Sequence, residues 1–272
     1  MTHAISENIV PVPQVTRYIS ISNQKGGVGK TTTTINLATG LVAVGKKVLV
    51  VDLDPQGNAS TGLGIDRASR TSGTYELLFA ECTIDEAATE TKVPNLFVVP
   101  SSVHLSGAEL ELVNAEDREN RMKTALSKSK THYDYVLFDC PPSLNLLTLN
   151  ALCASDGVLV PLQCEFFALE GLSHLVKTVE RVKSSLNNNL ELLGVVLTMY
   201  DKRNRLSMQV ADNVREFFGD KVYETVIPRN VRISEAPSFG LPAIVYDMHC
   251  AGSKAYIHLA KEMIKREKAR DV

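Results

Sequence analysis

The sequence lacks a surplus of either charge, because its formal net charge is −2 over 272 residues. A globally basic protein that binds polyanions with its whole surface is therefore excluded, and any contact with nucleic acid requires a local basic patch. The chain also lacks a membrane-length apolar run and a basic start followed by an apolar stretch. We therefore expect neither a membrane span nor a secretory signal, and we expect a cytoplasmic protein.

Paired cysteines are absent as well. The five cysteines are scattered and form no C-x-x-C pair. This spacing indicates free thiols in a reducing compartment rather than a disulfide framework. Gly/Ser-rich linkers, repeats and low-complexity tracts are also missing, so nothing in the composition divides the chain. We expect residues 1–17, which contain Pro11 and Pro13, to be a flexible extension, and residues 18–272 to form a single domain.

Apolar runs typical of buried strands alternate with segments of helical periodicity. This alternation predicts an α/β fold, a doubly wound, mostly parallel sheet with helices on both faces. The carboxyl ends of such strands meet at one edge, so we expect the loops after Asn23, Asp52 and Asp139 to lie together. The predicted strands are 18–23, 47–52, 96–99, 135–139, 157–161 and 192–199, and the predicted helices are 31–44, 105–129 (in one or two pieces), 144–154, 169–186, 207–218 and 253–270.

A glycine-rich loop connects the first predicted strand to the first predicted helix. It reads Gly26, Gly27, Val28, Gly29, Lys30, Thr31. Glycines let backbone N–H groups close around phosphate oxygens, and the helix N-terminus adds a favourable dipole. Gln24 stands where the usual P-loop pattern has its first glycine, so the loop is a variant. Lys30 is placed to bridge β- and γ-phosphates, and the Thr31 hydroxyl to ligate Mg²⁺.

The whole string from Lys25 to Thr32 is the deviant Walker A motif, and with it the sequence resembles the ParA/MinD group of ATPases, most of all the chromosomal ParA (Soj) proteins. The resemblance extends over roughly residues 18–268. It implies the P-loop NTPase fold, ATP and Mg²⁺ as cofactors, and a homodimer in the ATP state. In that dimer Lys25 reaches the partner's ATP, whereas Lys30 acts on the ATP of its own chain.

Four acids match further blocks of this group. Asp52 and Asp54 end a strand, and taken alone they favour a helix cap or an Asx turn. The family match implies instead that Asp54 orients the hydrolytic water and that Asp52 supports the Mg²⁺ shell. Asp139 ends an apolar run, which is a Walker B pattern that holds Mg²⁺ directly or through water. Glu165 matches a family glutamate near the ribose at the dimer interface.

Basic residues gather between positions 201 and 232, but seven cations share that stretch with five acids, so charge alone predicts a solvated surface. Arg203, Arg205 and Arg232 fall in predicted loops and match family arginines on the DNA-facing side of the dimer. Such contacts go to the phosphates of double-stranded DNA and carry no sequence information. Pro228 and Arg229 match a block that flanks adenine in relatives, so Arg229 serves either the nucleotide or DNA.

The resemblance therefore implies a slow ATPase switch that segregates chromosomes or plasmids. ATP drives dimerisation, the dimer binds DNA non-specifically on the nucleoid, and a ParB-type centromere-binding protein stimulates hydrolysis. A helix-turn-helix domain is not expected before the first strand. The alternative is a MinD-like positioning ATPase that binds membranes through residues 253–270. The narrow apolar stripe of that segment favours a helix docked on the sheet, with no integral membrane association.

Overall fold

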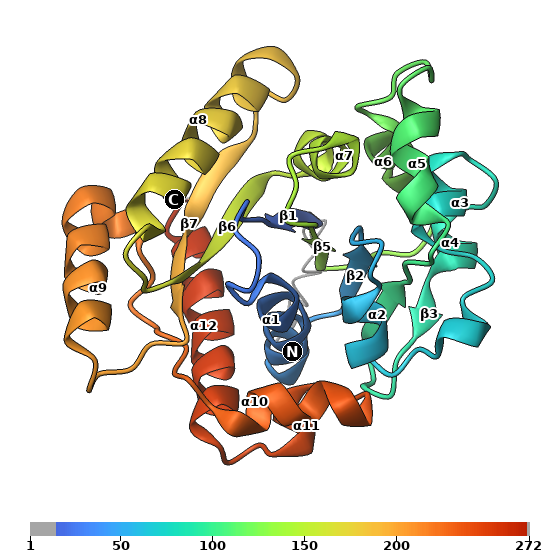
Figure 1. Ribbon diagram of the computed structural model, residues 1–272. Helices are drawn as coiled ribbons and strands as arrows, with labels where there is room; N and C mark the ends of the chain where they lie inside the picture. The colour runs from blue at the N-terminus through green and yellow to red at the C-terminus, as the bar shows by residue number, and fades with distance from the viewer. Residues whose placement is uncertain (1–14, 271–272) are drawn as a thin grey trace, which may run out of the picture.

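The computed structural model describes residues 15–270, and in this part of the chain a single seven-stranded sheet carries helices on both faces (Figure 1). The strand order is β3-β4-β2-β5-β1-β6-β7. All neighbouring strands are parallel except β3 and β4. The expected doubly wound, mostly parallel α/β fold is thereby confirmed. The strands are β1 (Arg17–Ile21), β2 (Val48–Asp52), β3 (Thr89–Glu90), β4 (Leu96–Val99), β5 (Tyr135–Asp139), β6 (Gly157–Gln163) and β7 (Glu191–Thr198).

Alternating side chains of the strands build a separate core on each face of the sheet. In β2, Val48 and Val50 point into the core beneath α1 and α12, whereas Leu49 and Val51 point into the core beneath α3 and α5 to α7. A third core lies between β6, β7, α8 and α9. The helices are α1 (Lys30–Ala43), α2 (Asn58–Gly62), α3 (Thr74–Leu78), α4 (Ile84–Ala87), α5 (Leu105–Leu112), α6 (Arg121–Leu126), α7 (Leu146–Ala154), α8 (Ala168–Ser185), α9 (Arg205–Phe218), α10 (Val231–Glu235), α11 (Ala243–Tyr246) and α12 (Ala251–Lys268).

The sequence-based elements match the long strands and helices within a few residues, but two loop assignments were wrong. Arg205 is the first residue of α9, and Arg232 lies in α10 rather than in a loop. The cause is an asparagine before each helix: the Asn204 side chain accepts from Leu206 N at 3.0 Å, and Asn230 accepts from Arg232 N at 2.9 Å. Asparagine is a strong N-cap residue, so α9 begins two residues before the predicted helix 207–218, and α10 forms where no helix was predicted.

Short elements between β2 and β4 were also missed, namely α2, α3, α4 and the antiparallel β3. Of the extension predicted for residues 1–17, residues 1–14 lie outside the described part of the chain, and Arg17 is already the first residue of β1.

The last helix, α12, packs against α1, as the sequence favoured. Tyr256 is fully buried, and its hydroxyl lies 3.2 Å from the Thr33 hydroxyl of α1. Leu259, Ala260 and Met263 extend the same buried side. Within residues 15–270, no helix has the length and apolar character needed to cross a bilayer.

Gly40 marks the closest approach of α1 to α12. A Cβ at this position would lie 2.9 Å from the Tyr256 carbonyl oxygen and 3.3 Å from the Ala260 Cβ. We predict that Gly40→Ala destabilises the protein by about 1–3 kcal/mol, because overpacking outweighs the helix propensity of alanine. The matched control is Gly171→Ala in α8, where a Cβ meets no atom within 4 Å and the change should stabilise by up to about 1 kcal/mol. Equilibrium urea unfolding measures both; a Gly40→Ala protein as stable as wild type would contradict the packing.

Candidate active site

The glycine-rich loop lies between the carboxyl end of β1 and the amino end of α1. Gly27 and Gly29 have φ values of 75° and 89°, a left-handed conformation that favours glycine. The Val28 carbonyl accepts a 2.8 Å hydrogen bond from the Thr198 hydroxyl of β7. Asn23 donates to the Pro161 carbonyl of β6 at 2.8 Å. The loop is therefore held by neighbouring strands, and no side chain caps the first N–H groups of α1.

Lys30 lies across this loop with its ammonium group almost out of solvent. The residue is 7% exposed, and its Nζ donates to the Lys25 carbonyl at 3.1 Å. Burial lowers the pKa of Lys30, and the negative charges of Asp139 and Asp54 oppose that shift. A desolvated lysine that donates only to one neutral carbonyl retains hydrogen-bonding capacity for an anion at the mouth of the loop.

Asp139 ends β5 in a fully buried position beside α1. Its Oδ1 accepts from the Thr34 hydroxyl at 2.9 Å, and its Oδ2 has no hydrogen-bond partner among residues 15–270. Burial, reinforced by the charge of Asp52, raises the pKa of Asp139 to about 8, while the nearby Thr31 hydroxyl and the hydrogen bond from Thr34 oppose the shift.

Asp52 ends β2, directly opposite Asp139 in the register of the parallel pair. Ser60 donates to its Oδ2 from the backbone at 2.8 Å and from the hydroxyl at 2.6 Å. Asp54 N donates to its Oδ1 at 3.2 Å. Burial raises the pKa of Asp52 to about 6 against these hydrogen bonds. Asp54 itself is half-buried, and its Oδ1 accepts from Gln56 N at 2.9 Å.

The buried acids fit a divalent cation. Two carboxylates this close in a dry site disfavour joint ionisation unless a cation compensates them. The unpartnered Oδ2 of Asp139 and the neighbouring Thr31 hydroxyl are oxygen ligands that suit Mg²⁺. The described residues contain no group of three or more His, Cys, Asp or Glu able to hold a metal by itself. This agrees with Mg²⁺ chemistry, in which one or two carboxylates act together with substrate phosphates.

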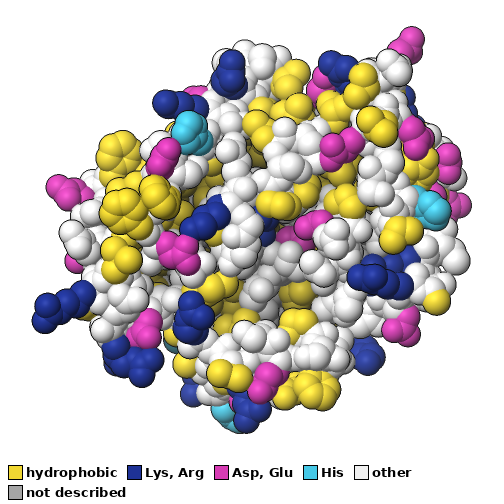
Figure 2. Space-filling model, in the orientation of Figure 1, with side chains coloured by type: hydrophobic (Ala, Val, Ile, Leu, Met, Phe, Trp, Pro, Cys, Tyr) yellow, Lys and Arg dark blue, Asp and Glu magenta, His cyan; other side chains and the backbone are white. Residues whose placement is uncertain are grey.

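Lys25 and Glu165, which stand in the loops after β1 and β6, form an ion pair with each other. Both side chains remain more than two-fifths exposed, at 43% and 44%. Phe166 and Phe167 follow directly and are 75% and 64% exposed. Figure 2 shows hydrophobic side chains gathered on this side of the molecule, near the start of α8. The four residues thus form one exposed surface of mixed apolar and charged character.

The three predicted DNA-binding arginines differ in their surroundings. Arg203 makes a two-point contact with Asp201, with distances of 3.0 and 2.9 Å, and lowers the pKa of that acid to about 2. Arg232 lies 3.0 Å from Glu235 and 3.6 Å from Asp247. Arg205 is exposed and makes no side-chain hydrogen bond or ion pair within residues 15–270.

Arg203 and Arg229 line one broad pocket of about 820 Å³ together with Lys202, Lys254 and His258. Pro228 pairs with Tyr200 just beyond the end of β7, so this pocket begins next to the strand that holds the loop.

Several residues around these groups were missed from the sequence. Ser60 and Thr34 bond the two buried acids, and Lys254 of α12 joins the basic pocket. The only sequence signal for Thr34 is its place one helical turn after Lys30. Ser60 follows Asp52 by eight residues, but no motif indicates that it bonds to that acid. The pocket partners of Lys254 come from a distant segment.

Comparisons with known proteins agree with this arrangement. Residues 16–192 match the protein family described as "AAA domain". The chromosome partitioning protein ParA of Caulobacter vibrioides is 59% identical over 256 residues, which covers 93% of this chain and 96% of that protein. The sporulation initiation inhibitor protein Soj of Bacillus subtilis is 53% identical over 247 residues, covering 91% and 98%.

A solved structure has the same fold. The cobyrinic acid a,c-diamide synthase of Mycobacterium smegmatis, crystallised with ADP and magnesium, superposes with a TM-score of 0.82 at 35% identity, covering 93% of this chain and 96% of that one. The fold, the deviant Walker A loop and these identities together lead to one conclusion: the chain belongs to the AAA-domain family and, within it, to the ParA/Soj partitioning ATPases of the ParA/MinD group.

Proposed function

We propose that this ATPase is a dimerising switch of the ParA type, which binds double-stranded DNA without sequence preference and segregates chromosomes or plasmids. The observation that carries the proposal is that Lys25 is exposed and that the adjacent Gly26 and Gly27 of the phosphate-binding loop have free space beside them. A Cβ at Gly26 or Gly27 would meet no atom within 4 Å. The loop therefore has room for a second copy to approach closely.

The cis site has a consistent division of roles. Backbone N–H groups of the loop and Lys30 hold the triphosphate, and Thr31 and Asp139 hold Mg²⁺, with Asp52 behind them. Mg²⁺ neutralises charge on the β- and γ-phosphates when it is bound. Asp54, whose turn is fixed by the bond from Gln56 N, orients the attacking water. The proposed nucleotide-binding residues are Lys25, Gly26, Gly27, Val28, Gly29, Lys30, Thr31, Thr32, Glu165, Pro228 and Arg229.

The trans role of Lys25 requires its ion pair with Glu165 to open. Exposed ion pairs contribute little, so exchanging the carboxylate for a partner's phosphates costs about 1 kcal/mol or less. Opening also releases Glu165 for the ribose. Burial of the neighbouring Phe166 and Phe167 supplies apolar area for the dimer, since both are largely exposed in the single chain.

DNA binding is assigned to Arg203, Arg205 and Arg232, with Lys202 and Lys254 as neighbours. Arg205 offers its charge directly, whereas Arg203 and Arg232 exchange an acid for a DNA phosphate. Arg229 lines the same pocket as Arg203. That position supports a role toward DNA, while the attachment of Pro228 at the end of β7 supports one toward the nucleotide.

The site is proposed to act in the cytoplasm on the nucleoid, where a ParB-type protein stimulates a slow intrinsic ATPase. A MinD-like membrane role has less support, because the apolar side of α12 is already buried against α1.

Asp54 gives the first test of the mechanism. We predict that Asp54→Ala binds ATP and dimerises but hydrolyses ATP at least about 100-fold more slowly, because the group that orients water is gone. Asp54→Asn keeps an oxygen that can accept the hydrogen bond from Gln56 N. It therefore serves as the control that separates loss of the carboxylate from disruption of the turn. Phosphate release and light scattering measure turnover and dimers. Unchanged phosphate release in Asp54→Ala would assign the role to another residue.

Arg203 and Arg205 give the test of DNA binding. We predict that Arg203→Glu and Arg205→Glu each weaken binding to unrelated DNA sequences equally and lower the log–log salt slope by about two units per dimer, since each change removes one phosphate contact per subunit. The control is Arg181→Glu, which changes an exposed arginine of α8 and should leave the slope unchanged.

Filter binding over a salt series with ATP and Mg²⁺ measures the slope, after light scattering has shown that each variant dimerises. Co-sedimentation with liposomes provides the comparison. A slope that stays at the wild-type value in both variants, or binding to liposomes but not DNA, would reject the DNA role.

A further inference from the structure

A pocket of about 320 Å³ opens beside the turn that carries Pro55 and Gln56, immediately after Asp54. Its other walls are the segment from Arg67 to Arg70 and the start of α5. No Asp or Glu is among the described residues that line it. Figure 2 shows Lys and Arg side chains together on the right of this face, next to the segment that follows β2. Cations without acids in a concave site create a positive potential that attracts an anion.

Two arginines supply this charge, and neither has a carboxylate partner within ion-pair distance. Arg67 is exposed and makes no side-chain hydrogen bond or ion pair within the described part of the chain. Arg70 is fixed in place by uncharged acceptors alone, while its Nε is buried without a partner. The acceptors are Gly57 O at 3.3 Å, Ser101 O at 3.0 Å, Thr61 Oγ1 at 2.8 Å and Ile65 O at 2.8 Å.

The segment that leads into α5 adds an unpaired hydroxyl to the same pocket. The first N–H groups of α5 already donate to the carbonyls of Ser102, Val103 and His104. No side chain caps this helix, and the pocket is lined by Ser102, His104 and Ser106 around its first turn. The hydroxyls of Ser101 and Ser102 are buried without hydrogen-bond partners. Buried polar groups left unpaired are costly. The Ser102 hydroxyl and Arg67 are therefore the donors that can bind an anion in this pocket.

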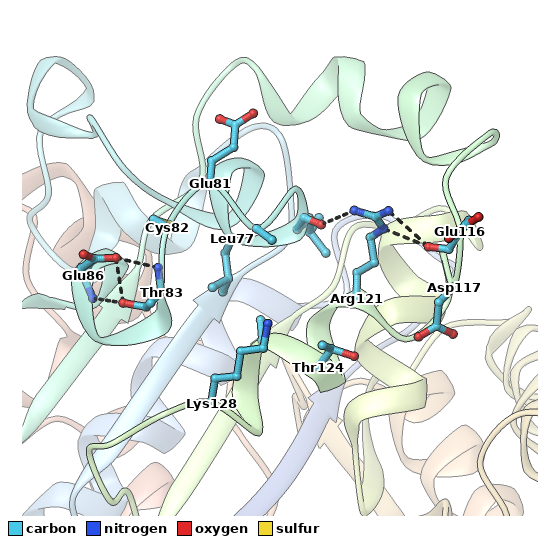
Figure 3. A pocket seen from close by; sticks show the side chains of 13 residues that line it. Leu77, Glu81, Cys82, Thr83, Glu86, Glu116, Asp117, Arg121, Thr124 and Lys128 are labelled. Atoms are coloured by element: carbon cyan, nitrogen blue, oxygen red, sulfur yellow. Dashed lines mark hydrogen bonds between the residues drawn. The ribbon is translucent and has the colours of Figure 1, made fainter.

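A second cavity differs from this pocket in its charge. The cavity of about 360 Å³ between α3, α4 and α6 has an acidic rim (Figure 3). Arg121 in that cavity already donates to the carbonyls of Leu78 and Glu116. Its acids are Glu81, Glu86, Glu116 and Asp117.

We propose that the pocket beside Gln56 is an oxyanion site that binds phosphate, either as the free ion or as the phosphoryl group of a small ligand. Arg67 and the Ser102 hydroxyl hold the oxyanion, and Arg70 adds its positive charge to the same pocket. The pocket also connects to the nucleotide site, because Ser101 N donates to Ser60 Oγ at 3.0 Å and Ser60 Oγ donates to Asp52 at 2.6 Å.

The test is an isothermal titration of inorganic phosphate into the full chain saturated with ADP and Mg²⁺, so that the P-loop is already filled. We expect one phosphate per chain, and at least about tenfold weaker binding in Arg67→Ala and in Ser102→Ala, since each removes a donor to a charged ligand. Neither change leaves a protein group unpaired, because Arg67 and the Ser102 hydroxyl have no partners now. Arg181→Ala in α8 is the matched control and should bind as wild type.

A parallel titration with uridine monophosphate distinguishes the two sources of the ligand. Competition with inorganic phosphate supports a phosphoryl group on a larger molecule, and its absence supports the free ion. Absence of binding by either probe would overturn the proposal, as would phosphate binding that Arg67→Ala and Ser102→Ala leave at wild-type strength.

Discussion

The structure depends on the parallel register that sets Asp52 of β2 opposite Asp139 of β5, next to the end of β1. Buried main-chain pairing along three strands fixes this register, so two carboxylates and Lys30 are brought together out of water. Such a group is unfavourable without a ligand, as the raised pKa values of both acids indicate. ATP with Mg²⁺ brings charges of both signs, so part of the ligand's binding free energy comes from relieving the repulsion between the two buried acids.

On the surface, too, charged residues are paired with residues other than their proposed ligands. These cations are proposed to bind a partner's ATP or DNA, but in the single chain each forms an ion pair with an acid. Lys25 is paired with Glu165, Arg203 with Asp201, and Arg232 with Glu235. Each pair is exposed and therefore weak, so a partner's phosphates or the DNA backbone can replace the acid at small cost. Intramolecular acids of this kind keep the single chain near neutral, with a net charge of −2, and leave the cations available once a polyanion is close.

Much of the fold was predictable, because long apolar strands and periodic helices carry strong local signals. The sequence predicts strands 96–99 and 135–139. It also predicts that the loops after β1, β2 and β5 lie close together at one edge of the sheet. The short helices between β2 and β4 have too few residues to show periodicity. The bonds from Ser60 to Asp52, the pairing of Lys25 with Glu165 and the orphaned oxygen of Asp139 arise from tertiary packing, so no local pattern indicates them. The helix starts at Arg205 and Val231 could have been predicted, since Asn204 and Asn230 are recognisable caps.

The most direct measurement of the central claim is the ATP affinity of Lys30→Ala, measured by fluorescence with a labelled ATP in Mg²⁺ buffer. Lys30 is the buried cation of the loop, so its loss should weaken ATP binding at least about 100-fold. The control Lys261→Ala removes an exposed lysine from α12 and should bind ATP as wild type does. Unfolding curves establish that both variants are folded. A folded Lys30→Ala protein with near-normal ATP affinity would contradict the assignment of the strand-end loops as the nucleotide site.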